Sequence, residues 1–310
     1  MKNIIDQYFN KNFQPSFLVF FRISIGAVLM VHFLSFWEDF DLLYGIDSII
    51  PVEIHNAFYN YKVFSYHNIE IFLSSYFKNP SYIFKYSYIA LLSFIIIGFF
   101  SRICALILLF MQVSFVKTAS LFFYGADFFS SMSLFYIIIF PSSHYFSVQQ
   151  KFFPKTLIGF PVRSLSISKR IIQVHLCIAY FFSGFDKILG FNWWNGESVW
   201  KSLNLPNFTH FIHIPALVNQ NFNIVYITAG WMIIAVEILY PVFININKTR
   251  KIWLTITILM HIGIIICFNL FFFSAIMIVW NLTSYYFNYY DQEKTFTKNT
   301  TSLTTDIVSP

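Results

Sequence analysis

Long apolar runs dominate the chain, and short polar stretches separate them. Breaks at charged residues, Pro and Gly divide this pattern into eight candidate helices, several of them long enough to cross a hydrocarbon core of roughly 30 Å. The expected helices span residues 16–37, 82–100, 103–122, 127–141, 169–190, 223–245, 251–268 and 271–289. The pattern therefore predicts an all-α, polytopic integral membrane bundle of about eight transmembrane helices embedded in a lipid bilayer.

Composition supports the same class of protein, because 57% of the residues are hydrophobic and 11% are charged. The first apolar run does not end at a small-residue cleavage site, so we expect it to be a retained span and not a signal peptide. We predict one membrane domain over residues 1–290. A polar cytoplasmic tail rich in Lys, Thr, Asn and Ser is expected over residues 291–310.

The distribution of Lys and Arg between the predicted helices indicates their orientation. If eight helices alternate, thirteen Lys and Arg residues fall on one side of the membrane and four on the other. Because cytoplasmic loops carry the excess of these residues, both termini are predicted to lie in the cytoplasm, with the protein in the plasma (inner) membrane. The long segments 38–81 and 191–222 would form the external face. The net charge of +6 then reflects membrane orientation, and no nucleic-acid partner is predicted.

Cysteine and histidine spacing gives no sign of a metal or redox centre. Cys104, Cys177 and Cys267 lie in separate predicted spans without a neighbour at motif spacing. We interpret them as small hydrophobic core residues. The loop histidines also lack ligand spacing, so no metal is predicted.

Ionisable residues inside the predicted spans are candidate functional groups, because a charge is costly in a bilayer. They are Arg22, His32, Lys117, Asp127, His175, Asp186, Lys187, Glu237 and His261. Glu237 and His261 are equally far from the turn at residues 247–251, which predicts one depth of roughly 12 Å, where they can face each other. Arg22 could join them. This inner layer would be a proton relay, part of a ligand pocket, or a hydrogen-bonded set that fixes helix packing.

A second, outer layer is expected near the external boundary. Its members are His32, Lys117, Asp127 and Lys187. An amine among apolar and aromatic residues is a candidate base near neutral pH. The plain alternative is that Lys187 reaches for the external headgroups as a membrane anchor.

Small residues precede Lys187 on the same helical face. Ser183 and Gly184 lie one turn back and would leave room beside the amine for a flat ligand. Tyr180 lies two turns back and offers a hydroxyl partner. The pattern therefore suggests a binding pocket as well as a base.

This stretch also resembles a known family. Residues 180–188, which read YFFSGFDKI, followed by Trp194-Asn-Gly, resemble the vitamin K-dependent gamma-carboxylases and their bacterial relatives, the horizontally transferred transmembrane (HTTM) domain family. Weaker agreements are FFRISIG at 20–26, LYGIDSIIP at 43–51, and Glu237 through Pro241 with His261. The resemblance extends over about residues 17–290, nearly the whole chain.

The resemblance implies a chemistry for the predicted site. The corresponding carboxylase lysine deprotonates reduced vitamin K, which would make Lys187 the base for a reduced menaquinone or vitamin K-like quinol. Tyr180, Ser183, Gly184 and Trp194 would then border the cofactor. Asp127 falls near the position of a functional carboxylase histidine, so it is a second catalytic candidate.

Two functional hypotheses follow from these observations. The first is an integral membrane protein that binds and deprotonates a quinol near the outer leaflet, with a carboxylase-like or oxidase-like activity. Peptidyl-glutamate carboxylation is not predicted, because the large extramembrane portion of the carboxylases has no counterpart here. The second is a non-enzymatic accessory factor for the maturation or export of a small secreted peptide. A transporter is disfavoured, because no inverted repeat is evident.

Overall fold

The computed structural model describes residues 13–51, 54, 65–118, 123–157, 163–204 and 223–287. These residues form helices joined by turns and contain no strand, which confirms the predicted all-α class. Within these ranges six helices are long and apolar enough to cross a membrane. They are α2 (Ser16–Ser35), α6 (Pro80–Ile97), α7 (Ser101–Thr118), α10 (Arg163–Leu189), α14 (Asn223–Phe243) and α15 (Arg250–Phe268).

Two shorter apolar helices complete the set of eight expected from hydropathy. They are α8 (Gly125–Ile139) and α16 (Phe271–Asn281), which continues as the π-helical turn η4 (Leu282–Tyr286). The clearest difference from the expected boundaries is α10, which begins at Arg163 and not at 169. Its first turns are polar, so hydropathy did not indicate them although they are helical. The predicted tail at 291–310 lies outside the described residues, as do parts of both predicted external segments.

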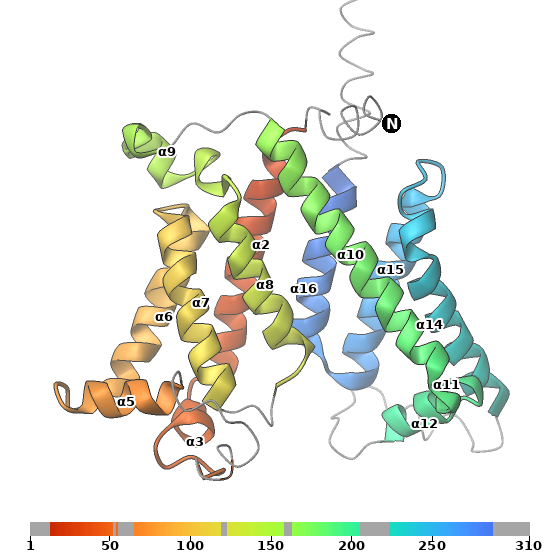
Figure 1. The fold of residues 1–310 in the computed structure, drawn as a ribbon, viewed down its shortest axis with the longest axis horizontal. Coiled ribbons are helices and arrows are strands. Elements are labelled where there is room, and N and C mark those ends of the chain that lie inside the picture. Colours follow the sequence, from red (N-terminus) through yellow and green to blue (C-terminus); the bar gives the residue numbers. More distant parts are fainter. Residues whose placement is uncertain are drawn as a thin grey trace, which may run out of the picture. The chain divides into compact units, whose positions relative to one another are not determined.

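The chain divides into two compact units, each with its own helices (Figure 1). Unit 1 comprises residues 1–17 and 162–310, and unit 2 comprises residues 18–161. Hydropathy alone indicated one membrane domain and did not suggest this division, because it reports which segments are apolar and not which segments contact each other.

Unit 2 contains α2, α6, α7 and α8 with short helices at their ends. The short helices are α3 (Phe40–Tyr44), α5 (Tyr66–Ser74), η2 (Ser142–His144), α9 (Val148–Phe152) and η3 (Pro154–Thr156). Aromatic rings fill the core, and Phe33 stacks on Tyr88 with centroids 4.2 Å apart. Helix α6 begins with Pro80 and ends at Gly98, whose φ of 77° is left-handed, so both boundaries follow local residue preferences.

Unit 1 contains α10, α14, α15 and α16, together with α11 (Phe191–Trp194) and α12 (Glu197–Asn204). Figure 1 shows α10 and α14 lying side by side, with α11 and α12 after the C-terminal end of α10. Close approach depends on glycine. A side chain at Gly230 would meet the carbonyl oxygen of Trp193 at 2.9 Å, and one at Gly196 would meet the α14 backbone at 2.6 Å. These contacts place the segment after α10 directly against the first half of α14.

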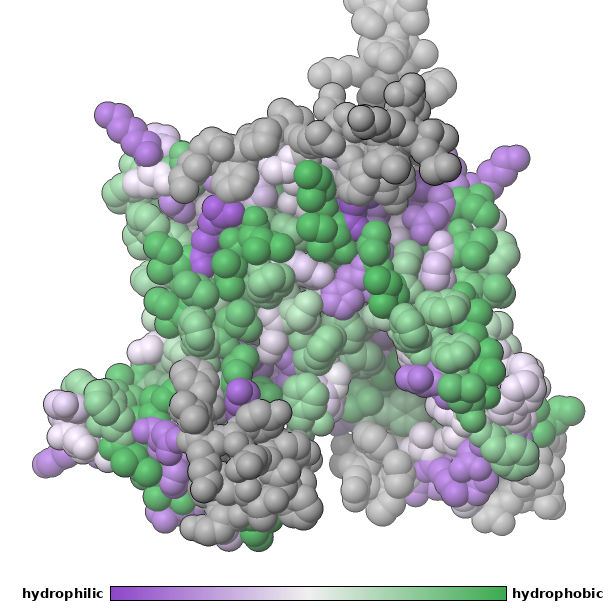
Figure 2. Space-filling view, viewed as in Figure 1, coloured by the Kyte–Doolittle hydropathy of each residue, from purple (hydrophilic) through white to green (hydrophobic). Residues whose placement is uncertain are grey.

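Large apolar side chains cover the outward faces of the long helices. Met232, Leu259 and Phe110 are 63%, 59% and 56% exposed. Figure 2 shows apolar residues along the flanks of the helices and more polar residues towards their ends. A soluble protein rarely exposes so much contiguous apolar surface, whereas a bilayer requires it. The chain is therefore a multi-pass membrane protein.

Candidate functional site

The Lys187 ammonium is held by three oxygen atoms near the end of α10. It donates to Glu237 Oε2 at 2.8 Å, to Ser183 Oγ at 2.7 Å and, more weakly, to the Ser183 carbonyl at 3.3 Å. It also lies 5.3 Å from the ring centroid of Trp193. The side chains of Lys187 and Glu237 are 19% and 9% exposed. A largely buried ion pair therefore connects α10 to α14, two helices that are apolar enough to cross a membrane.

Gly184 allows this pairing by bringing the two helices into contact. A Cβ atom at Gly184 would lie 2.7 Å from Ile238 Cγ1 and 3.0 Å from Glu237 Cβ. The space that the sequence suggested for a flat ligand beside Gly184 is thus filled by α14, which corrects the reasoning that placed a ligand there. Gly184 supports the site by close packing, because any side chain would push α14 away.

The pair joins two residues that the sequence placed in different layers. Helix α10 has 27 residues and is about 40 Å long, more than the hydrocarbon core requires. The segment after it then packs against the first part of α14. Lys187 consequently meets α14 at Glu237, about 21 Å from the first residue of that helix at 1.5 Å per residue. Counting depth separately from each helix end could not reveal this offset.

Proline in α14 adds a backbone feature beside the pair. Pro241 lies inside the helix and has no N–H group, so the Glu237 carbonyl four residues earlier lacks its usual helical donor. The backbone at Glu237 is thereby less constrained than that of an ordinary helix. Glu237 thus provides the buried carboxylate at a turn of α14 that lacks one helical hydrogen bond.

A second polar network lies in the core of unit 1. Tyr240 Oη donates to Asn281 Oδ1 at 2.7 Å. Asn281 Nδ2 donates to the Met277 carbonyl at 2.8 Å and to Tyr180 Oη at 2.9 Å. A backbone carbonyl can only accept a hydrogen bond, so the amide atom of Asn281 that faces the Met277 carbonyl must be the nitrogen. The Tyr180 ring also packs on the Tyr240 ring, with centroids 4.1 Å apart.

His261 stands at the end of this chain of hydrogen bonds. Its Nε2 atom lies 2.7 Å from Tyr180 Oη. Since Tyr180 already accepts from Asn281, its own proton is best donated to Nε2, which assigns the proton of a neutral ring to Nδ1. Nδ1 is buried and has no hydrogen-bond partner among the residues that the structure describes. The chain of donors therefore ends in a donor without an acceptor.

The expected pairing of Glu237 with His261 is not what the structure has. Glu237 bonds to Lys187, and His261 bonds to Tyr180. Tyr180, expected beside the lysine as a ligand partner, is 3% exposed and belongs to the core network. Glu237 and His261 both bond to residues of α10, whereas the estimated depths had paired them with each other.

Trp194 stabilises the end of α10. Its Nε1 atom donates to the Ile188 carbonyl at 2.6 Å, and its ring meets the Trp231 ring edge to face at 4.5 Å. An indole donor satisfies one of the carbonyls that a helix leaves unpaired at its C-terminal end. The ring of the neighbouring Trp193, which the sequence did not assign to the site, lies 5.3 Å from the ammonium.

Asp127 and Arg22 belong to unit 2, where each has local partners. Asp127 Oδ2 accepts from the Tyr124 backbone N–H at 3.2 Å at the start of α8, as a capping residue does. Burial, to which the charge of Asp127 adds, raises the pKa of the Tyr124 phenol to about 12, so it stays protonated near neutral pH. The proposed outer layer involves both units and stays a prediction.

Arg22 is fully buried and donates to three backbone carbonyls. Its partners are Ser142 at 2.6 Å, Phe146 at 2.7 Å and Tyr145 at 3.2 Å. A side chain at Gly98 would lie 2.9 Å from the guanidinium group. Arg22 therefore fixes the turn after α8, which is a structural role. Its predicted place in the inner layer involves both units and stays a prediction.

Sequence reasoning missed Asn281 and Tyr240, because its search for candidate groups was limited to Asp, Glu, Lys, Arg and His. Asn281 is fully buried, and a polar side chain in the apolar run 271–289 was a signal that could have identified it. Within the described part of the chain, no group of three His, Cys, Asp or Glu residues is arranged to hold a metal ion. Comparison with known proteins adds no relative, since no family model, curated protein or solved structure matches this chain.

Proposed function

We propose that this membrane protein binds a reduced isoprenoid quinone and exchanges a proton with it at the Lys187–Glu237 pair. The observation that carries this proposal is the pair itself, two opposite charges at 2.8 Å in apolar helices. Ionisable residues inside membrane-spanning helices are costly, and they commonly mark ligand sites or proton pathways. The resemblance of residues 180–188 to the gamma-carboxylases supports a quinol such as reduced menaquinone as the partner.

The groups around the pair fit a quinol hydroxyl. A hydroxyl both donates and accepts, and the pair offers an ammonium donor beside a carboxylate acceptor. Trp193 supplies a flat aromatic face next to the ammonium. Phe185 and Leu189, 42% and 69% exposed, supply apolar surface on the same end of α10. Because α14 closes the space at Gly184, Trp193 would take the role that the sequence assigned to that glycine.

The pair can hold its proton on either partner. With the proton on nitrogen, Lys187 and Glu237 form an ion pair. Transfer from Lys187 Nζ to Glu237 Oε2 breaks one N–H bond, forms one O–H bond, and leaves a neutral amine beside a neutral acid. The neutral amine then accepts a proton from the quinol hydroxyl, and the hydrogen bond to Ser183 Oγ holds the amine in position. A bound reduced quinone supplies the acidic hydroxyl and the electrons for oxygen chemistry.

Equilibrium binding tests this proposal without requiring turnover. Reduced menaquinone is titrated under anoxic conditions into the full chain in lipid nanodiscs, with binding followed by tryptophan fluorescence. Lys187→Ala should weaken binding about tenfold, since a hydrogen bond to a charged group contributes about 1.5–3 kcal/mol. Lys201→Ala is the matched control, because Lys201 is an exposed lysine paired with Glu197. Equal affinities for the two variants would refute the proposal.

A second candidate function is an accessory role for a small secreted peptide. The observation favouring it is the exposed apolar junction of α10 and α11, where Leu189 and Phe191 are 69% and 75% exposed. An apolar peptide could pack on this junction. Co-purification of a secreted peptide that is lost in Phe191→Ala but kept in Phe152→Ala, a variant of an exposed phenylalanine in unit 2, would favour this role. Unchanged secretion when the protein is deleted would exclude it.

A further inference from the structure

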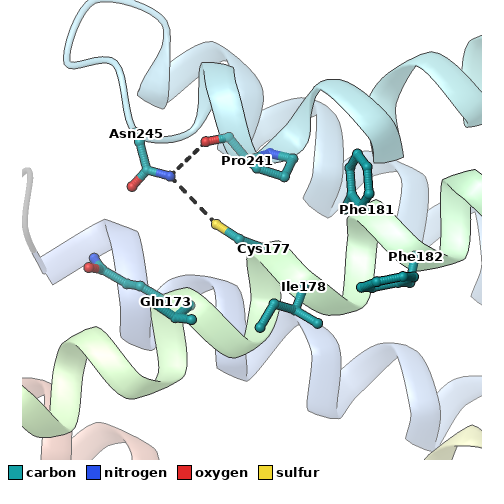
Figure 3. A pocket seen from close by; sticks show the side chains of 8 residues that line it. Gln173, Cys177, Ile178, Phe181, Phe182, Pro241 and Asn245 are labelled. Carbon is teal, nitrogen blue, oxygen red and sulfur yellow. Dashed lines mark hydrogen bonds between the residues drawn. The ribbon is translucent and has the colours of Figure 1, made fainter.

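A groove of about 280 Å³ lies between α10 and the C-terminal part of α14, away from the Lys187 site (Figure 3). Its wall on α10 consists of Val174, Ile178, Phe181 and Phe182, which are 49%, 52%, 39% and 56% exposed. All four lie on a membrane-spanning helix. A groove with such a wall is not filled by water, because water has no hydrogen-bond partners along it. The medium that fills it is hydrocarbon.

The opposite end of the groove is polar. Asn245 Nδ2 donates to the Pro241 carbonyl at 2.8 Å and contacts Cys177 Sγ at 3.5 Å. Figure 3 shows the oxygen of the Asn245 side-chain amide turned away from both partners. Gln173 is 2% exposed and donates to the Ser284 carbonyl at 2.7 Å. The groove thus changes from apolar to polar along its length, as a membrane lipid does.

Positive charge gathers at this polar end. The Arg250 guanidinium donates to the Ile244 carbonyl at 3.1 Å and to the Asn245 carbonyl at 3.2 Å, which fixes it beside the groove. Lys248 and Lys251 are exposed on the same turn and helix start. No Asp or Glu occurs between residues 238 and 290. The mouth of the groove therefore complements a negatively charged group.

We infer that this groove binds an anionic glycerophospholipid, with an acyl chain along α10 and the phosphate beside Asn245, Lys248 and Arg250. Basic pockets between transmembrane helices at the cytoplasmic side are known sites for anionic headgroups. The distribution of Lys and Arg predicts that side for this end of unit 1. The proposal does not rest on the quinol hypothesis, because Lys187 bonds to Glu237 and Ser183, and none of these three residues lines the groove.

Lipid binding to the purified full chain tests the apolar part of this inference. Phosphatidylglycerol and phosphatidylcholine are titrated separately, and bound lipids are counted by native mass spectrometry. The wild type should prefer phosphatidylglycerol. Val174→Trp fills the groove and should lower phosphatidylglycerol affinity about tenfold, a loss of about 1.4 kcal/mol. Val225→Trp, at a position that is 47% exposed on α14 outside the groove, should bind like the wild type. Unchanged binding in Val174→Trp would overturn the proposal.

Charge variants test the polar part and do not depend on how well the tryptophan variant folds. Lys248→Gln should reduce the preference for phosphatidylglycerol over phosphatidylcholine, because it removes a positive charge from the polar end of the groove. Lys248 is exposed, so the substitution should leave the fold intact. Lys151→Gln, at a basic residue on α9 of unit 2, should leave the preference unchanged. Equal affinity of the wild type for both lipids would overturn the inference. Displacement of bound lipid by menaquinone, lost in Val174→Trp, would also overturn it and would assign the groove to an isoprenoid chain.

Discussion

Removing the charge of Glu237 should destabilise unit 1 strongly. At 2.8 Å and an effective dielectric constant of about 20, the attraction between Lys187 and Glu237 is about 6 kcal/mol, and the desolvation of both groups offsets most of it. Glu237→Gln leaves the Lys187 ammonium without its counter-charge, and removing one partner of a buried pair typically lowers the free energy of unfolding by about 3–5 kcal/mol. We expect about 3 kcal/mol, because Lys187 is 19% exposed and Ser183 still accepts from it.

A double-mutant cycle separates the pair from its surroundings. Lys187→Met and Glu237→Leu each leave one charge without its partner, whereas the double variant replaces both with apolar groups. Buried ion pairs replaced in this way are often as stable as the original or more so. The double variant should therefore be close to the wild type, so the coupling free energy should be about as large as the two single losses together, about 6 kcal/mol if each single variant costs about 3 kcal/mol.

Unfolding by SDS in mixed micelles, followed by tryptophan fluorescence, measures these differences. Glu197→Gln is the matched control, because Glu197 pairs with Lys201 at 2.6 Å but both side chains are exposed, at 39% and 54%. An exposed pair contributes little, so this variant should unfold like the wild type. The reasoning is refuted if the effects of Lys187→Met and Glu237→Leu add without coupling. It is also refuted if Glu237→Gln behaves like Glu197→Gln.

Three further predictions concern packing, the core network and pH. Gly184→Ala should cost about 1–3 kcal/mol, since its Cβ would lie 2.7 Å from an α14 side chain, while Gly263→Ala, with nothing within 4 Å, should be neutral or slightly stabilising in the same unfolding assay. Asn281→Leu should lose about 1–3 kcal/mol, because the buried Tyr240 hydroxyl loses its acceptor while Tyr180 keeps its bond to His261, and retained stability would contradict the assigned network. Burial raises the pKa of Glu70 above its ordinary 4.5. The contribution of this carboxyl group to the stability of the fold is therefore complete below pH 4.5 and is lost as pH rises through the pKa in the folded state. The melting temperature of the wild type relative to Glu70→Gln should accordingly fall with rising pH, and a constant difference would argue against this effect.

Hydropathy predicted the helices well because a bilayer demands long apolar segments whose backbone groups are paired internally. The polar start of α10 escaped that signal, because residues 163–168 are helical but not hydrophobic. The division into two units also escaped it. Which helices pack together depends on side-chain shape and on small residues such as Gly184, and a hydropathy profile contains neither.

The candidate site could be predicted only in part. Lys187 was identifiable, since an ammonium at the end of an apolar helix is unusual. Its partner was not, because depth was counted from each helix end as though all helices crossed the bilayer squarely. A helix of about 40 Å has to tilt or extend beyond the core, which shifts its residues relative to those of its neighbours. Asn281 was overlooked because it carries no charge, although its burial in an apolar run has the same physical cost.

Oxygen-dependent epoxidation of reduced menaquinone is the most direct test of the proposed chemistry. Purified wild type, Lys187→Ala and the control Lys201→Ala are compared in lipid vesicles, with the quinone products separated by chromatography. The account predicts epoxide from the wild type and from Lys201→Ala and none from Lys187→Ala. No epoxide from the wild type, or equal amounts from Lys187→Ala, would contradict the assignment of Lys187 as the base for a quinol.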